Sequence, residues 1–434
     1  MLSYYFGLAL HSLKRNRVLT ALMILAIAMG IGASMTTLTV LHVLSGDPMP
    51  GRSGSLYYPQ IDPRDMADYG PNVEPPDQVT WTDGQYLLKA KRATRQALMT
   101  SGMVPLQPAQ SSIDPFHAVA LFTTADFFPM FDVPMQYGNA WGESEDEAKA
   151  RVVVISAKLN DKLFGGQNSV GKELRLQETA FRIIGVLGDW HPQPHFYQIY
   201  MGRYADNEDI FVPLSTSRDV HMEHDGETDC WGIGGGDDKH LESGPCVWMQ
   251  FWVQLDSAQQ AAAYKDFLVH YSQEQHAAGR FLRSPNVRLR NVMQWLDYQH
   301  VVPSDTRLQV WLALGFLLVC LVNTVGLMLA KFMRRAGELG VRRALGASQQ
   351  ALFAQLLVES GVVGLAGGAL GLLLASLGLW LVRRQPADYA RLAHMDARML
   401  LATFALAICA SLLAGFLPAW RACRITPALQ LKAN

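Results

Sequence analysis

Residues 18–44, VLTALMILAIAMGIGASMTTLTVLHVL, contain no Asp, Glu, Lys or Arg. A helix that crosses the hydrocarbon core of a bilayer needs roughly 20 apolar residues, and buried helices of soluble proteins seldom remain uncharged over such a length. The run is also longer than the apolar core of a cleaved signal peptide, which covers roughly 7–15 residues. It therefore predicts a retained transmembrane helix.

Three later segments have the same apolar character, residues 307–330, 356–382 and 399–420. They account for a charged fraction of 17%, because an ordinary soluble domain carries about 25%. The net charge of −1 argues against a nucleic-acid partner, which would need a basic face. We therefore predict a membrane protein of four transmembrane α-helices, with a large α+β extracytoplasmic domain (45–306) inserted between helices 1 and 2.

Basic residues flank the predicted spans mostly on one side, and such clusters mark the cytoplasm. The loop at 383–398 carries four arginines on the other side, but three clusters outweigh it. Both termini are thus expected in the cytoplasm, with an interfacial helix at 1–17 and a tail at 421–434. The three clusters are Lys14, Arg15 and Arg17; Lys331, Arg334, Arg335, Arg342 and Arg343; and Arg421, Arg424 and Lys432.

The stretch Gly166–Lys172, GQNSVGK, matches the nucleotide-binding pattern G-x-x-x-x-G-K, but Glu173 replaces the hydroxyl residue that holds Mg²⁺. A segment outside the cytoplasm also meets no ATP pool. Its neighbours ARVVVIS, AKLNDKLFG, KELRLQ and TAFRIIGVLGD predict a strand, a short helix and a hairpin. We therefore expect no nucleotide, and no other cofactor, on this chain.

Ordered sequence segments resemble a known family. TTADFFPMFDVPMQYGNAW, RVVVIS, LFGG, SVGKELRL, FRIIGV and IFVPLST follow one another as in MacB-like periplasmic core domains. RRAGELGVRRALGASQQALFAQLLVES (334–360) and LPAWRACRITPALQLK (417–432) resemble the cytoplasmic link and the C-terminal pattern of FtsX-like permeases. The chain thus resembles ABC transporter permeases of the MacB/FtsX class, with the poorest match at 57–116 and 202–305. The resemblance implies a multi-pass protein of a bacterial inner membrane.

The link at 331–355 contains ELGVRRALG, which predicts a short amphipathic helix with Gly346 as its stop. The spacing of four residues between Glu338 and Arg342 favours an ion pair, and Ser348 is a natural N-cap for the next helix. Such a helix could dock in a groove of another protein or lie on anionic lipid, and the residues alone leave both open. The resemblance implies docking on an ATPase. The residues expected to transmit its motion are Glu338, Leu339, Val341, Arg342, Arg343, Leu345 and Gly346.

The resemblance further implies two copies of a separate cytoplasmic ATPase, which would carry ATP and Mg²⁺, and a second permease subunit, identical or related. A periplasmic adaptor and an outer-membrane channel are further possible partners. The expected function is export or extraction of a substrate by mechanotransmission. The alternative is an FtsX-type signalling complex that activates an extracytoplasmic enzyme such as a cell-wall hydrolase. No catalytic constellation is recognisable, so the chain is not expected to be an enzyme.

Glycines of the third predicted span and cysteines of the predicted outer domain show further patterns. Gly364 with Gly368, and Gly367 with Gly371, form small-x-x-x-small pairs that favour close helix packing, either within one chain or across a dimer. Cys230 and Cys246 are the cysteines of the predicted outer domain, and in an oxidising compartment they could form a disulfide. The His- and Asp-rich segment between residues 221 and 246 has no metal-binding spacing, so we expect a polar loop there.

Overall fold

The computed structural model describes residues 6–8, 12, 16–67, 69–70, 72–108, 113–232, 241–385, 388–395 and 397–424. The chain forms two compact units. The helical unit consists of residues 1–45 and 302–434, and the outer unit consists of residues 46–301. Most of the predicted interfacial helix and residues 425–434 of the predicted tail lie outside the described residues.

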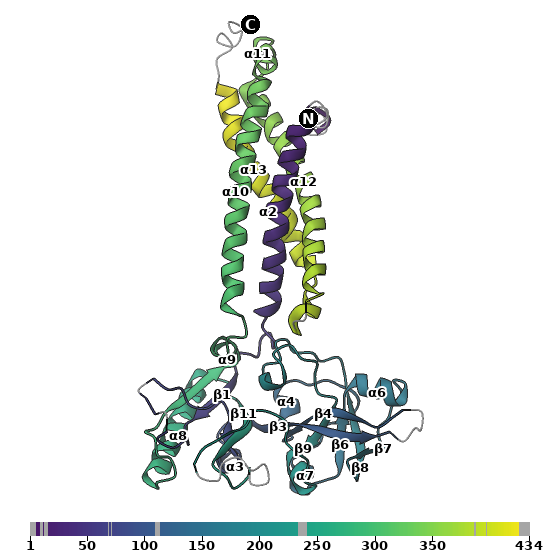
Figure 1. The fold of residues 1–434 in the computed structure, drawn as a ribbon, viewed down its shortest axis with the longest axis vertical. Coiled ribbons are helices and arrows are strands. Elements are labelled where there is room, and N and C mark those ends of the chain that lie inside the picture. Colours follow the sequence, from purple (N-terminus) through teal and green to yellow (C-terminus); the bar gives the residue numbers. More distant parts are fainter. Residues whose placement is uncertain are drawn as a thin grey trace. The chain divides into compact units, whose positions relative to one another are not determined.

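Four long helices build the helical unit (Figure 1). Each is long and apolar enough to cross a membrane, which agrees with the four predicted spans. Helix α2 packs against α10 and α12, and α12 also packs against α13. The helices are α2 (Arg17–Leu44), α10 (Ser304–Arg334), α12 (Gln349–Val382) and α13 (Ala397–Arg424).

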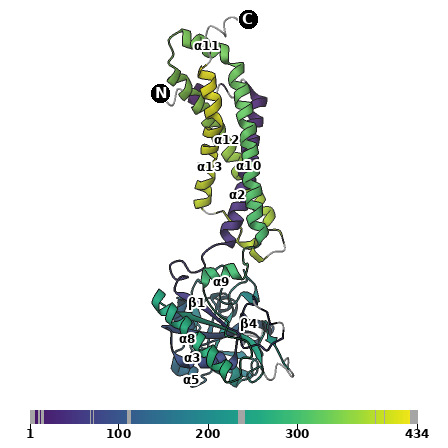
Figure 2. The same cartoon turned by 90° about the vertical axis from the view of Figure 1, so that its left-hand side faces the viewer.

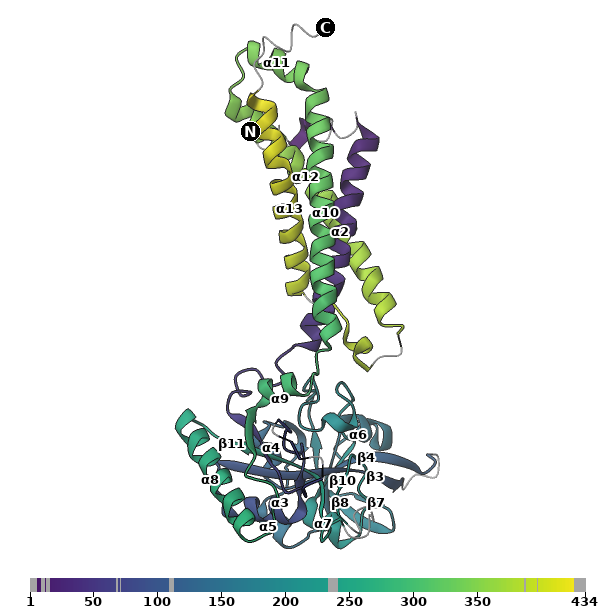
Figure 3. The same cartoon turned by 60° about the vertical axis from the view of Figure 1, so that its left-hand side comes forward.

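The helices extend beyond the apolar runs at several ends. The predicted link 331–355 is divided in the structure among the end of α10, the short helix α11 (Ala336–Ala344) and the start of α12. The predicted loop 383–398 contains a short 3-10 helix, Asp388–Leu392, and the first residues of α13. Hydropathy locates the apolar part of a span, but a helix continues into its polar flanks as long as its backbone hydrogen bonds do. Figures 2 and 3 show α11 at the same end of the bundle as the start of α2 and the end of α13.

Twelve strands among the described residues of the outer unit form one sheet, with the main order β12-β1-β11-β3-β4-β9-β6-β8-β5. Most neighbours pair antiparallel, whereas β4 with β9 and β6 with β8 pair parallel. The strands are β1 (Leu56–Ile61), β2 (Val79–Thr80), β3 (Arg95–Gln107), β4 (Phe116–Thr123), β5 (Met135–Gly138), β6 (Val152–Ile155), β7 (Glu173–Leu176), β8 (Thr179–Leu187), β9 (Ile210–Pro213), β10 (Asp229–Cys230), β11 (Cys246–Gln254) and β12 (Val287–Asn291).

Helices pack against this sheet and complete an α+β unit, as the sequence predicts. Trp248 and Phe122 are buried in its apolar core. The helices are α3 (Trp81–Ala90), α4 (Phe127–Met130), α5 (Glu143–Glu147), α6 (Ala157–Phe164), α7 (Leu214–Asp219), α8 (Ala258–Ala277) and α9 (Val292–Tyr298).

The predicted strand–helix–hairpin unit is confirmed as β6, α6, β7 and β8. Ser156 caps α6, because its Oγ accepts a hydrogen bond from the Leu159 N–H at 3.0 Å. Gly165 ends the helix in the left-handed region, with φ of 64°. Local capping chemistry thus sets both ends of this helix, which is why the sequence pattern was sufficient to predict it.

A buried carboxylate joins distant parts of the outer unit. Asp83 on α3 is 0% exposed, and it accepts hydrogen bonds from Thr80 Oγ1 and Tyr271 Oη, both at 2.6 Å. Arg280 forms an ion pair with the same carboxylate. Because Tyr271 lies on α8 and Arg280 follows that helix, Asp83 fastens α3 to the far end of the unit's sequence.

Candidate functional site

The short helix α11 begins at Ala336, directly after α10, and ends at a sharp corner. Leu345 N–H donates to Val341 O at 3.0 Å, and Gly346 N–H donates to Arg343 O at 3.1 Å. Gly346 adopts φ of +100°, a conformation that residues with a side chain rarely adopt. Ser348 then caps α12 by accepting from the Ala351 N–H at 3.2 Å. The predicted stop and N-cap are thus confirmed.

One side of α11 is buried and another is exposed. Leu339 is 5% exposed and belongs to the apolar core of the helical unit. Val341 and Leu345 are 51% and 82% exposed, and their spacing of four residues places them on one face. The end of this short helix thus presents two apolar side chains: Val341 is half-exposed, and Leu345, the C-cap residue directly after the helix, is largely exposed.

The charged residues of α11 hold the helix to its surroundings. Arg342 forms the predicted ion pair with Glu338 at 2.9 Å, and its Nη1 donates to Gln355 Oε1 on α12 at 3.2 Å. Arg343 Nη1 donates to the Cys423 carbonyl oxygen on α13 at 3.1 Å. The two arginines therefore connect α11 to two of the long helices.

A buried carboxylate lies beside the start of α11. Glu359 of α12 is 2% exposed, and its Oε1 lies 2.6 Å from Lys331 Nζ near the end of α10. Its Oε2 lies 3.1 Å from Arg335 Nη1, at the junction between α10 and α11. The sequence showed Glu359 as the acidic residue near an end of the third span, but it did not show these partners.

The four glycines predicted to serve helix packing lie on two sides of α12. An added Cβ at Gly368 would come within 2.7 Å of the Ala407 Cβ on α13, and Gly364 approaches α13 in the same way. An added Cβ at Gly367 would come within 2.7 Å of Ile27 on α2, where Gly371 also packs. The close approaches seen are therefore between helices of one chain.

The P-loop-like stretch of the outer unit is a turn between α6 and β7. Gly171 N–H donates to Ile183 O at 2.8 Å, and Lys172 N–H donates to Ser169 O at 3.1 Å. The Lys172 ammonium lies 4.6 Å from the centroid of the Phe164 ring. These two amides thus bond the chain itself, and the turn leads into a strand rather than into the N-terminus of a helix, where phosphate groups bind.

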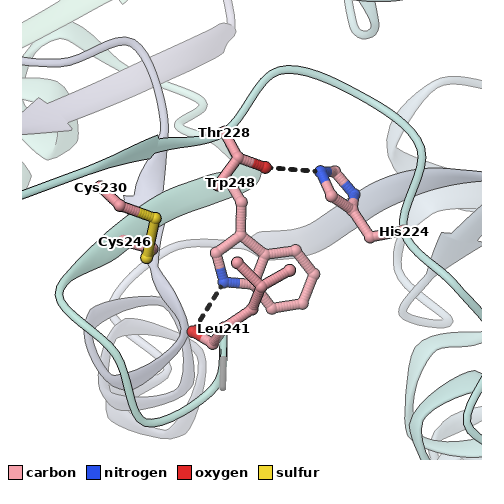
Figure 4. Close-up of a disulfide and its surroundings, with 6 residues drawn as sticks. All are labelled: His224, Thr228, Cys230, Leu241, Cys246 and Trp248. Carbon is pink, nitrogen blue, oxygen red and sulfur yellow. Dashed lines mark hydrogen bonds between the residues drawn. A yellow bond between two sulfur atoms is a disulfide. The ribbon is translucent and has the colours of Figure 1, made fainter. Parts of the chain in front are cut away.

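The two outer cysteines lie opposite each other on neighbouring strands. Cys230 of β10 pairs with Cys246 of β11, and the structure joins them in a disulfide (Figure 4). Trp248 packs beside them, and its Nε1 donates to Leu241 O at 3.1 Å.

The histidine-rich segment next to the disulfide contains no metal site among its described residues. His224 lies 2.7 Å from Thr100 Oγ1 through Nδ1 and 3.1 Å from Thr228 Oγ1 through Nε2. Both ring nitrogens are therefore occupied by hydroxyl groups. In the described ranges of the whole chain, no three His, Cys, Asp or Glu residues are placed to hold a metal ion. Residues 233–240 of this segment lie outside these ranges.

A cleft of about 950 Å³ opens in the outer unit between α3, α5 and α7, with Trp81 and Trp141 in its lining. Burial raises the pKa of the Asp146 carboxyl in this cleft to about 7, although hydrogen bonds from Ala125 N–H and Trp141 Nε1–H oppose that rise. Asp146 belongs to the acidic run GESEDEAK (142–149), and from the sequence alone a run of charges predicts a solvated loop rather than a carboxyl in a cleft.

Two families match the chain in sequence. Residues 20–269 match the MacB-like periplasmic core domain, and residues 310–427 match the FtsX-like permease C-terminal domain. The chain belongs to the MacB/FtsX-like family of ABC transporter permeases. This confirms the resemblance seen in the sequence and makes the chain a multi-pass permease of the inner membrane. The helix α11 lies within the FtsX-like part.

Relatives of this MacB/FtsX-like permease are known in several bacteria. The pyoverdine export ATP-binding/permease protein PvdT of Pseudomonas aeruginosa is 24% identical over 424 residues, which are 96% of this chain and 57% of PvdT. The macrolide export ATP-binding/permease protein MacB of Burkholderia thailandensis is 25% identical over 431 residues, 97% of this chain and 59% of that protein. The chain thus spans less than three fifths of the length of these two relatives.

Two solved structures each match part of this permease. The periplasmic region of MacB from Actinobacillus actinomycetemcomitans matches with a TM-score of 0.37 and 14% identity, over 59% of this chain and 96% of that one. The extracellular domain of the transporter YknZ from Gram-positive bacteria matches with a TM-score of 0.36 and 13% identity, over 54% of this chain and 100% of that one.

Proposed function

We propose that this permease couples ATP hydrolysis on a separate cytoplasmic ATPase chain to movement of its own outer unit, and so exports or extracts a substrate by mechanotransmission. In this proposal α11 and both termini face the cytoplasm, and the outer unit lies outside it. The basic residues that flank the spans support this orientation, because such clusters mark the cytoplasm. ATP and Mg²⁺ bind to the ATPase.

One observation carries the proposal: the end of a short helix held by hydrogen bonds presents two exposed apolar side chains, Val341 and the C-cap residue Leu345. Arg342 and Arg343 connect this helix to α12 and α13. A helix held in this way can push on the spans when its exposed face is pushed. Amphipathic helices dock with such faces in grooves of other proteins. The relatives are named ATP-binding/permease proteins, which favours docking of this face on an ATPase over binding to a lipid surface.

The complex we propose contains two permease subunits, identical or related, and two ATPase subunits. A periplasmic adaptor and an outer-membrane channel would complete the export route. The relatives are named for the export of pyoverdine and of macrolides, and this favours export over the signalling alternative. An FtsX-type complex would instead co-purify with a stoichiometric extracytoplasmic enzyme such as a cell-wall hydrolase.

Leu345→Glu tests the docking face most directly, because the side chain of Leu345 is 82% exposed and its loss disturbs little within the chain. We expect the variant to lower the stimulation of the co-purified ATPase about tenfold, as for a contact at the centre of an interface. Charge reversal at Arg342 and Arg343 should act in the same direction. It would also break their bonds to Glu338, Gln355 and Cys423, so it is the less selective test.

Gln350→Glu provides the matched control, since it adds the same charge at an exposed position at the start of α12. It should leave both membrane insertion and ATPase stimulation unchanged. If Leu345→Glu inserts normally and stimulates the ATPase as the unaltered chain does, α11 is not the docking element. A loss of contact between α11 and anionic lipid, with unchanged ATPase stimulation, would favour a lipid surface instead.

A further inference from the structure

Glu359 brings together three parts of the helical unit. Its Oε1 accepts a hydrogen bond from Ser12 Oγ at 2.5 Å and lies 2.6 Å from Lys331 Nζ. Its Oε2 accepts from Arg335 Nη1 at 3.1 Å. Arg335 Nη1 also donates to Ser12 Oγ at 2.7 Å. One carboxylate of α12 therefore contacts the end of α10, the junction between α10 and α11, and Ser12.

The contacts continue along α11 and return to α12. Arg335 pairs with Glu338 at 3.3 Å, and Glu338 pairs with Arg342 at 2.9 Å. Arg342 then donates to Gln355 Oε1 at 3.2 Å. Because Gln355 and Glu359 are four residues apart, they lie on one face of α12, one turn from each other. The ring thus fastens α11 to α12 at two points.

Stability alone does not explain a buried ion cluster of this kind. Glu359 is 2% exposed and Lys331 is 1% exposed. Replacing a buried ion pair by well-packed apolar residues is often neutral or stabilising, whereas removal of one partner leaves a buried charge without compensation. Hydrogen bonds between charged groups have a preferred geometry, so they fix the orientation of the helices that carry those groups. Apolar contacts have no such preferred geometry.

We infer that Glu359 is the positioning residue of α11: its carboxylate fixes the orientation of the short helix on α10 and α12, so that Val341 and Leu345 are held out in a constant direction. The relevance of this orientation to ATPase docking rests on the proposed function. The orientation itself does not, and it can be measured on the chain alone.

Hydrogen–deuterium exchange on the full chain in lipid nanodiscs measures the hold on α11. Glu359→Gln keeps the size of the side chain and removes its charge, so that Lys331 and Arg335 lose their buried counter-charge. We expect exchange of the backbone amides in residues 337–345 to rise about tenfold, with unchanged exchange in the middle of α13. A general loss of stability would instead raise exchange in all the long helices, and that outcome would overturn the inference, as would unchanged exchange in α11.

Glu338→Gln is the matched control, because its carboxylate belongs to the same ring but is partly exposed. Exposed pairs contribute little, so exchange in α11 should rise about twofold or less. Glu359→Asp covers the case in which Glu359→Gln does not fold: it keeps the charge and shortens the reach. Exchange in α11 should then rise about threefold, with α13 unchanged. An equal response of α11 to Glu338→Gln and to Glu359→Asp would contradict the special role of Glu359.

ATPase stimulation, measured on the same variants, separates the two proposals. If Glu359→Gln loosens α11 but leaves the stimulation unchanged, the positioning role stands and the docking of an ATPase on α11 fails. If stimulation falls while exchange in α11 stays unchanged, the positioning role fails and the docking proposal stands.

Discussion

The helical unit and the outer unit each bury a carboxylate with arginine, but in different surroundings. In the outer unit, the buried carboxylate of Asp83 on α3 is bound by Thr80, Tyr271 and Arg280. In the helical unit, Glu359 lies where a nine-residue helix meets two long ones. The first carboxylate joins elements that many other contacts already hold. The second is a main connection of an element that has few others.

The same chemistry therefore has different consequences in the two units. Loss of Asp83 should weaken the fold of the outer unit as a whole, whereas loss of Glu359 should release one short helix. A buried charge indicates function more strongly where the element that it holds is small and exposed, because such an element gains little stability from apolar packing.

The largest expected effect is on the stability of the outer unit. Asp83→Ala removes the acceptor of Tyr271 and the counter-charge of Arg280, and a broken buried pair costs about 3–5 kcal/mol. Urea unfolding of the full chain, followed by tryptophan fluorescence, should show the outer-unit transition at lower denaturant. Glu143→Ala, which removes an exposed pair with Lys91, should leave the transition in place. An equal shift of the urea midpoint in both variants would mean that the buried ion pair stabilises the outer unit no more than the exposed one.

The stability of the helical unit should depend instead on the volume of the side chains between its helices. Gly368→Leu places a side chain where even a Cβ would lie 2.7 Å from Ala407, and overpacking of this kind costs about 1–3 kcal/mol. The midpoint of thermal unfolding in detergent should fall. Gly361→Leu, on the same helix, is the matched control, because no atom lies within 4 Å of an added Cβ there. A comparable loss in both variants would mean that helix packing does not depend on the α12–α13 contact.

The smallest expected effect is a pH dependence in the cleft. Native Asp146 takes up a proton near pH 7, because burial raises its pKa to about 7, whereas an unfolded Asp does so near pH 4. Between these values the native state binds more protons, so stability falls as the pH rises. Asp146→Asn removes this slope. Relative to the unaltered chain, the variant should therefore be more stable at pH 8 than at pH 5, by about 1 kcal/mol after screening by solvent.

The measurement is the urea midpoint of the variant and of the unaltered chain at both pH values. Asp219→Asn serves as the control without a slope, because hydrogen bonds from Arg151 and Lys149 lower the pKa of Asp219 to about 2. Its carboxyl is therefore ionised in the native and the unfolded chain at both pH values, and its loss should change the urea midpoint equally at pH 5 and pH 8. A difference between variant and unaltered chain that is the same at pH 5 and pH 8 would mean that Asp146 titrates normally.

The sequence was sufficient wherever a feature depends on neighbouring residues. The four apolar runs, the cap at Ser348, the corner at Gly346 and the pair Glu338–Arg342 each require residues only a few positions apart. The FtsX-like link, and with it the position of α11, could therefore be predicted before the structure was known. Hydropathy placed the spans well but could not show that α11 occupies only the middle of the predicted link.

The contacts that cross the chain could not be predicted. Asp83 and Arg280 are 197 residues apart, and Ser12 and Glu359 are 347 apart. Each of these side chains is typical of a solvated surface when it is considered alone, and only the fold brings the partners together. The helices that pack against the glycines of α12 could not be predicted either, because a small-x-x-x-small pair indicates close packing but does not identify the partner helix.

The disulfide between Cys230 and Cys246 allows a chemical test of the compartment in which the outer unit folds. Oxidising compartments let such bonds form and persist, whereas the bacterial cytoplasm keeps thiols reduced. The chain has five cysteines, of which Cys320, Cys409 and Cys423 are unpaired, so alkylation of the denatured, unreduced protein should modify three. Modification of all five would mean that the outer unit had never left the reducing side. Counting alkyl groups by mass thus reports the sidedness of the whole permease without a fused reporter.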